Sequence, residues 1–66
     1  MEGLGPYMRR RRDELDISLR ELAKRLDCSP AFISDIELGR RYPSDKVLSD
    51  IAYVLKVKVE DLRALT

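Results

Sequence analysis

Hydroxyl and guanidinium groups recur in this chain at positions suited to phosphate binding. Ser18, Ser29 and Ser44 each come directly before a stretch with helical periodicity. A serine there caps the first turn of the helix, and its hydroxyl can also donate a hydrogen bond to a phosphate oxygen. Arg40 and Arg41 follow the second of these stretches and add positive charge, and the unpaired N–H groups of helix starts favour anions. These groups together predict contact with a nucleic-acid backbone.

The residue types that enzymes and metal sites need are scarce. The 66 residues contain no histidine and a single cysteine, Cys28, and no glycine-rich phosphate loop is present. The spacing of metal ligands is also missing, and this set argues against a catalytic or metal site. We therefore expect no enzymatic activity, no cofactor, no metal and no small-molecule substrate, and we expect Cys28 to be a buried structural thiol.

The length and the charge of the chain limit the possible fold and partners. A chain of 66 residues predicts a single domain over residues 1–66, near the lower size limit for an independent core. Thirteen Lys and Arg against twelve Asp and Glu give a net charge of +1, so the total charge does not indicate nucleic acid, although Arg9–Arg12 and Arg40–Arg41 are local basic clusters. No apolar run approaches the roughly 20 residues of a membrane span, and the N-terminus has no signal-peptide pattern. These features predict a cytoplasmic protein with no membrane partner.

The periodicity of apolar residues is helical throughout and predicts an all-α domain. Met1–Gly5 is expected to be a loose lead, and the first helix is expected to open at Gly5-Pro6. The predicted helices cover residues from about 6 to 15, 19–26, 30–38, 45–55 and 59–65.

Residues 18–39 predict two short helices joined by a tight turn. Ser18 and Glu21 have the spacing of a capping box at the first helix, Ser29 caps the second, and Gly39 ends it. Helix, turn and helix in this spacing are typical of the DNA-binding helix-turn-helix, in which the second helix enters the major groove. The predicted recognition helix is therefore the one at about 30–38.

The residues of this unit also resemble a known family. The pair Leu22-Ala23, the run Ile33-Ser34-Asp35-Ile36-Glu37-Leu38-Gly39 and the pair Pro43-Ser44 are similar to the helix-turn-helix of lambda-repressor/Cro type, also called the xenobiotic-response-element family. The resemblance runs from Leu4 to about Leu62. It implies a compact five-helix lambda-repressor-like fold and a bacterial or phage transcriptional regulator, with repression the expected effect. It implies double-stranded DNA as the partner and a homodimer on a two-fold site.

Two departures from the family pattern bear on the site. Asp27 stands where the family usually has glycine, and aspartate tolerates the left-handed backbone conformation that a turn there would need. Leu19 stands where the family often has glutamine, so one phosphate contact is expected to be lost.

The predicted DNA contacts divide into two sets. Ile33 and Ile36 face inward, so the residues expected to face the bases are Pro30, Ala31, Phe32, Ser34 and Asp35. Those expected to lie along the phosphates are Ser18, Ser29, Leu38, Arg40, Arg41 and Ser44.

Two further predictions concern structure rather than bases. Arg12 and Glu37 resemble the family's buried ion pair between the first helix and the end of the third; the alternative is two solvated charges. Tyr53, Val57 and Leu65 are apolar residues beyond the needs of the core and are the candidates for a dimer surface.

A second function belongs to a different class. The predicted recognition helix carries no Arg, Asn or Gln at a base-reading position, and the net charge is close to zero. The alternative is therefore a protein-interaction module, such as an antitoxin or adaptor, that keeps the fold but uses the Phe32/Leu38 face on a protein partner.

Overall fold

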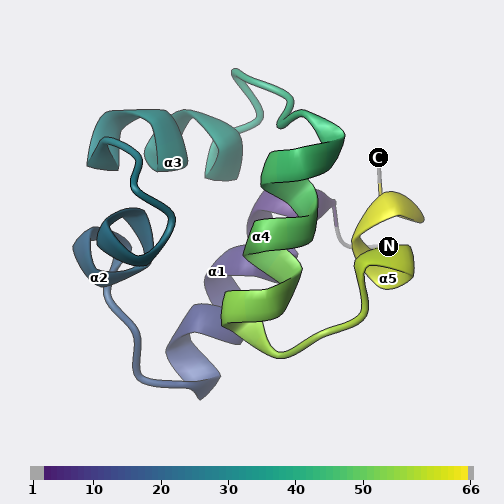
Figure 1. Ribbon diagram of the computed structural model, residues 1–66, viewed down its shortest axis with the longest axis horizontal. Coiled ribbons are helices and arrows are strands. Elements are labelled where there is room, and N and C mark those ends of the chain that lie inside the picture. Colours follow the sequence, from purple (N-terminus) through teal and green to yellow (C-terminus); the bar gives the residue numbers. More distant parts are fainter. Residues whose placement is uncertain (1–2, 66) are drawn as a thin grey trace.

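The computed structural model describes residues 3–65, which form helices joined by short loops (Figure 1). The helices are α1 (Leu4–Glu14), α2 (Leu19–Arg25), α3 (Pro30–Glu37), α4 (Asp45–Leu55) and α5 (Val59–Arg63). Residues 3–65 contain no strand, so the all-α prediction is confirmed. Among these residues, no helix is long and apolar enough to cross a membrane.

Serine side chains begin three of the helices, as predicted. The N–H of Glu21 donates to Ser18 Oγ at 3.0 Å, and those of Phe32 and Val47 donate to Ser29 and Ser44 at 3.2 and 3.3 Å. Only half of the expected capping box forms, because the Glu21 carboxylate accepts from Arg25 Nε at 2.9 Å instead. Each serine hydroxyl oxygen therefore accepts a hydrogen bond in its own helix cap, while the hydroxyl proton can still be donated to another group.

Helices α1 to α4 end in one common way. In α2, the N–H of Cys28 donates to the Ala23 carbonyl at 2.9 Å and that of Asp27 to Lys24 at 3.1 Å, the two hydrogen bonds of a Schellman motif. Equivalent pairs close the other three helices. The motif requires a left-handed residue, and these are Asp16, Asp27, Gly39 and Lys56, with φ of 57°, 55°, 79° and 58°.

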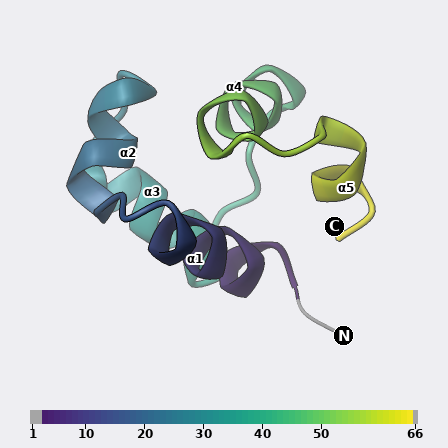
Figure 2. The same ribbon diagram turned by 90° about the horizontal axis from the view of Figure 1, so that it is seen from below.

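The core lies where the five helices meet. Figure 2 shows α2 and α3 on one side of the molecule and α4 and α5 on the other, with α1 between them. Helix α1 contacts both α3 and α4. The buried apolar side chains are Met8, Ile17, Leu22, Ala23, Ile33, Ile36, Leu48, Ile51, Ala52, Leu55 and Leu62.

The start of α1 differs from the prediction of a loose lead over Met1–Gly5. Leu4 begins the helix and Gly5 is buried, while residues 1 and 2 lie outside the described residues. A Cβ on Gly5 would overlap the carbonyl oxygen of Glu37, at the end of α3. Glycine is therefore needed here because two backbones meet, which spacing along the sequence could not show.

The ends of three further helices, α2, α3 and α5, differ from the prediction by one or two residues, whereas α4 has the predicted bounds. Leu26 and Leu38 are C-caps rather than helical residues, and α5 stops at Arg63. Such shifts fall where helices fray into their caps, and the recognition helix is correspondingly 30–37.

Candidate nucleic-acid interface

A buried ion pair fixes the end of α3 against α1. Arg12 Nε and Nη2 donate to the two Glu37 carboxylate oxygens at 2.7 and 3.0 Å, and Arg12 Nη1 donates to the Ile17 carbonyl at 3.0 Å. The two side chains are only 10% and 8% exposed. The hydrogen bond with Glu37 raises the pKa of Arg12 above its ordinary value, against the opposing effect of burial. The structure thus brings Arg12 and Glu37 together, and the two solvated charges of the alternative are not what it shows.

The outer face of α3 is open to solvent along its length. Pro30 and Ala31 are exposed at its start, Ser34 and Asp35 are half-buried in the middle, and Leu38 is 59% exposed just after its end. The helical periodicity of the sequence predicted that these side chains face outward. With the Arg12–Glu37 pair holding the far end, this face is presented rigidly.

The two loop arginines lie against α3. The Arg41 guanidinium sits over the Phe32 ring, 5.5 Å from its centroid, and Arg40 Nη1 lies 3.9 Å from Asp35 Oδ1. The loop backbone is also held against α3, because the amides of Arg40 and Arg41 both donate to the Asp35 carbonyl, at 2.8 and 3.3 Å. The sequence placed Phe32 among the base-facing residues, but its ring is half-buried and has the Arg41 guanidinium over it.

The predicted phosphate-facing residues are all exposed. Ser18, Ser29 and Ser44 lie at their helix starts with hydroxyl protons free to donate. Leu38 differs from the others in the set because its side chain has no polar group, and its amide already donates to the Ser34 carbonyl at 2.9 Å. Its side chain can therefore offer a nucleic acid only apolar contact, for example with sugars.

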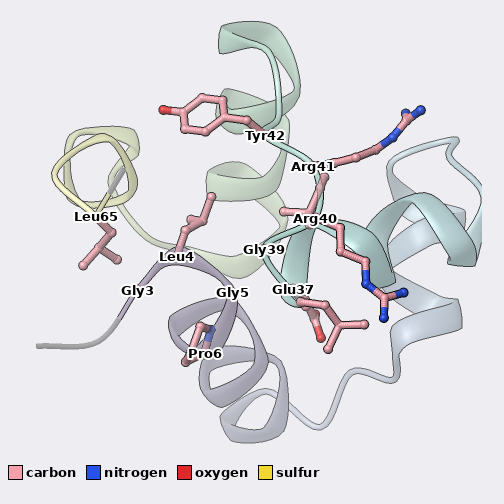
Figure 3. A pocket seen from close by; sticks show the side chains of 12 residues that line it. Gly3, Leu4, Gly5, Pro6, Glu37, Gly39, Arg40, Arg41, Tyr42 and Leu65 are labelled. Atoms are coloured by element: carbon pink, nitrogen blue, oxygen red, sulfur yellow. The ribbon is translucent and has the colours of Figure 1, made fainter.

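A hollow lies beside the loop that follows α3, next to the start of α1 (Figure 3). Leu4, Tyr42 and Leu65 line it together with Arg40 and Arg41, although the two arginine side chains extend away from those three. Tyr53, which is 86% exposed, lines a different hollow with Arg25, Val54 and Lys56. The structure therefore does not bring the dimer candidates Tyr53 and Leu65 together, and it leaves Val57 half-buried.

Cys28 packs at the turn between α2 and α3. It is half-buried rather than fully buried as expected, and its Sγ donates to the Leu26 carbonyl at 3.3 Å. In the described part of the chain, no cluster of His, Cys, Asp and Glu could hold a metal ion.

Comparison with known proteins decides the family. A family model described as helix-turn-helix matches residues 8–62, which is most of the chain. The chain belongs to the Cro/C1-type helix-turn-helix family. The chain therefore carries the helix-turn-helix domain of this family, whose relatives include proteins named as transcriptional regulators.

Two relatives carry the same unit in different settings. An uncharacterized HTH-type transcriptional regulator of Mycobacterium tuberculosis is 41% identical over 58 residues, which are 88% of this chain and 41% of the relative. The ImmF control region 10 kDa protein of Bacillus phage phi105 is 38% identical over 60 residues, 91% of this chain and 67% of the phage protein. The helix-turn-helix chain thus spans less than half of its mycobacterial relative.

Solved structures agree in fold. The clp gene regulator ClgR from Corynebacterium glutamicum superimposes with a TM-score of 0.84 at 33% identity, over 92% of this chain and 65% of that one. The master regulator for biofilm formation SinR, in complex with DNA, gives 0.83 at 31% identity over 91% of this chain and 97% of that one. The lambda-repressor-like fold expected from the sequence is confirmed.

Proposed function

We propose that this helix-turn-helix protein is a sequence-specific repressor that places α3 in the major groove of double-stranded DNA. The observation that carries the proposal is the open face of α3 with two arginines beside it. Asp35 and Ala31 would then meet base edges, since a carboxylate accepts from a cytosine amino group and a methyl group meets a thymine methyl. As a regulator of a bacterial or phage genome, the protein would act in the cytoplasm.

The surroundings of α3 supply the phosphate contacts. The hydroxyls of Ser18, Ser29 and Ser44 would donate to phosphate oxygens, and Arg40 and Arg41 would neutralise phosphate charge. The solved structure of SinR, which shares the fold, is a complex with DNA, and this supports DNA as the partner. A protein held across a promoter blocks access of the polymerase, which makes repression the simplest outcome, and the control region named for the phage relative supports a role of this kind.

The proposed active form is a homodimer. One module of this kind buries only about 600–1,000 Å² on DNA, and two copies would read half-sites roughly 34 Å apart. We place the dimer surface at Leu65 and Tyr42 because both line the hollow beside the loop, and Tyr42 is 66% exposed. Contact between copies there would fix the distance between their two α3 helices.

The deciding experiment is selection of binding sites from random duplex DNA at low salt, followed by a salt titration on the selected site. We expect a two-fold motif. We also expect the logarithm of the binding constant to fall linearly with the logarithm of salt concentration, with a slope of about −0.9 per phosphate contacted. An affinity indifferent to salt, or no binding at low salt, would refute the proposal. The Phe32/Leu38 protein-docking alternative has lost support because Arg41 lies over the Phe32 ring.

A further inference from the structure

Phe32 holds a place in α3 where a base contact was expected, yet its ring faces a cation of its own chain. The Arg41 guanidinium lies 5.5 Å from the ring centroid, within the range in which a cation is attracted to an aromatic face. The ring itself is half-buried and packs against the core. It is therefore a fixed platform, and the arginine on it is the movable partner.

Arg41 needs such a platform because little else holds its side chain in place. Residues 40–44 lie outside the helices, and Arg41 is exposed. Its backbone is tied to α3 by the hydrogen bond from its amide to the Asp35 carbonyl at 3.3 Å. A long side chain free in solvent loses much conformational entropy when it binds, whereas one already stacked loses less.

We infer that Phe32 is a positioning residue for Arg41 and not a reader of bases. The ring holds the guanidinium beside the start of α3, so that the planar group reaches a phosphate oxygen at the groove edge in a preset orientation. This inference rests on the proposed function and deepens it. Phe32 was predicted to be a base-facing residue, which would determine sequence preference. By this inference it instead acts with the phosphate-contacting residues, which determine the affinity for all DNA sequences.

The test compares substitutions that keep or remove one property at a time. Phe32→Leu keeps apolar volume and removes the ring, Phe32→Tyr keeps the ring, and Arg41→Lys keeps the charge and removes the planar group. Binding to the selected duplex is measured by fluorescence anisotropy, alone and combined with Arg41→Ala. Tyr7→Leu is the matched control, because it removes from α1 the ring that lies 5.1 Å from the guanidinium of another arginine, Arg10.

We expect Phe32→Leu to weaken binding roughly two- to fivefold, as loss of an exposed cation–π contact would, and to weaken it equally for the selected site and for variants of it. Phe32→Tyr should bind like the unsubstituted protein. Once Arg41 is alanine, Phe32→Leu should cause no further loss, whereas the effect of Tyr7→Leu on binding should be the same with and without Arg41. The inference would be overturned if the loss of affinity in Phe32→Leu simply added to that in Arg41→Ala, or if the selected motif changed. Either result would indicate that Phe32 contacts bases.

A second measurement needs no DNA and separates this inference from the proposed function. In the free protein, the δ protons of Arg41 should show an upfield ring-current shift in the NMR spectrum that persists in Phe32→Tyr and disappears in Phe32→Leu. Equal shifts in the unsubstituted and Phe32→Leu proteins would refute the stacking, whatever the protein binds. Ring-current shifts as expected, with no DNA binding by the unsubstituted protein, would instead refute the proposed function.

Discussion

Among single residues, Glu37 has the largest predicted effect on stability. Glu37→Ala leaves the Arg12 guanidinium buried without its carboxylate, and losing one partner of a fully buried pair costs roughly 3–5 kcal/mol. That is a large share of the total stability of a domain this small. We expect a fall in melting temperature of more than about 10 °C, from the usual few degrees per kcal/mol in small domains.

Two matched variants separate burial from charge in that experiment. Glu14→Ala removes a carboxylate that pairs with Arg10 and Arg11 but is 47% exposed, so it should cost at most about 1 kcal/mol. The double substitution Arg12→Met with Glu37→Leu should recover much of the loss because it removes both charges. If Glu37→Ala melted like Glu14→Ala, the pair would contribute no more than a solvated one.

We expect Asp35 to affect which DNA sequences are bound and Arg41 to affect how tightly all sequences are bound. Asp35→Asn turns an acceptor at the centre of the α3 face into a group that can also donate, so it should change the selected motif. Arg41→Ala should weaken all sequences about equally and reduce the salt slope by about 1 per subunit. Asp50→Asn, the same charge change on α4, should leave both unaltered. An unchanged motif with Asp35→Asn would show that another side of α3 faces the bases.

At the scale of the helices, a substitution at the C-terminal end of α4 is expected to increase the stability of the domain. Lys56 is the αL residue of its Schellman motif, at φ 58°, a conformation that costs a residue with a Cβ roughly 1–2 kcal/mol and glycine little. Lys56→Gly should therefore raise stability by about 1 kcal/mol, measured by urea unfolding. Lys24→Gly, within α2, should lower it by about as much. A loss with Lys56→Gly would mean that the lysine side chain stabilises the turn.

The helices themselves were predictable from sequence because their signals are local. Serine caps, the inward isoleucines of α3 and the turn at Asp27 depend on residues within a few positions of one another. The burial of Gly5 and the stacking of Arg41 on Phe32 were not predictable, because they depend on how separate segments approach in space. Lys56 was missed for a different reason: lysine has no preference for the left-handed conformation, so its type gave no signal.

For the whole molecule, the proposed dimer surface is the feature expected to set DNA affinity. Leu65→Glu should place a charge in the contact between copies, giving a monomer in sedimentation and a loss of tight binding to the two-fold site. Tyr53→Glu makes a comparable change in the other hollow and should leave the dimer intact. The reverse result would move the dimer surface to the α2–α4 side.

Two consecutive arginines of α1 reach in different directions. Arg12 binds Glu37 at the end of α3, while Arg11 Nε donates to the Leu55 carbonyl at the end of α4, at 2.9 Å. Local opening of either helix must therefore break contacts to the same turn of α1. The slowest-exchanging amides of α3 and α4 should accordingly share one free energy of opening in native-state hydrogen exchange, equal to that of global unfolding. Helix α3 would then have no independent melting step, and it would unfold only when the whole domain unfolds.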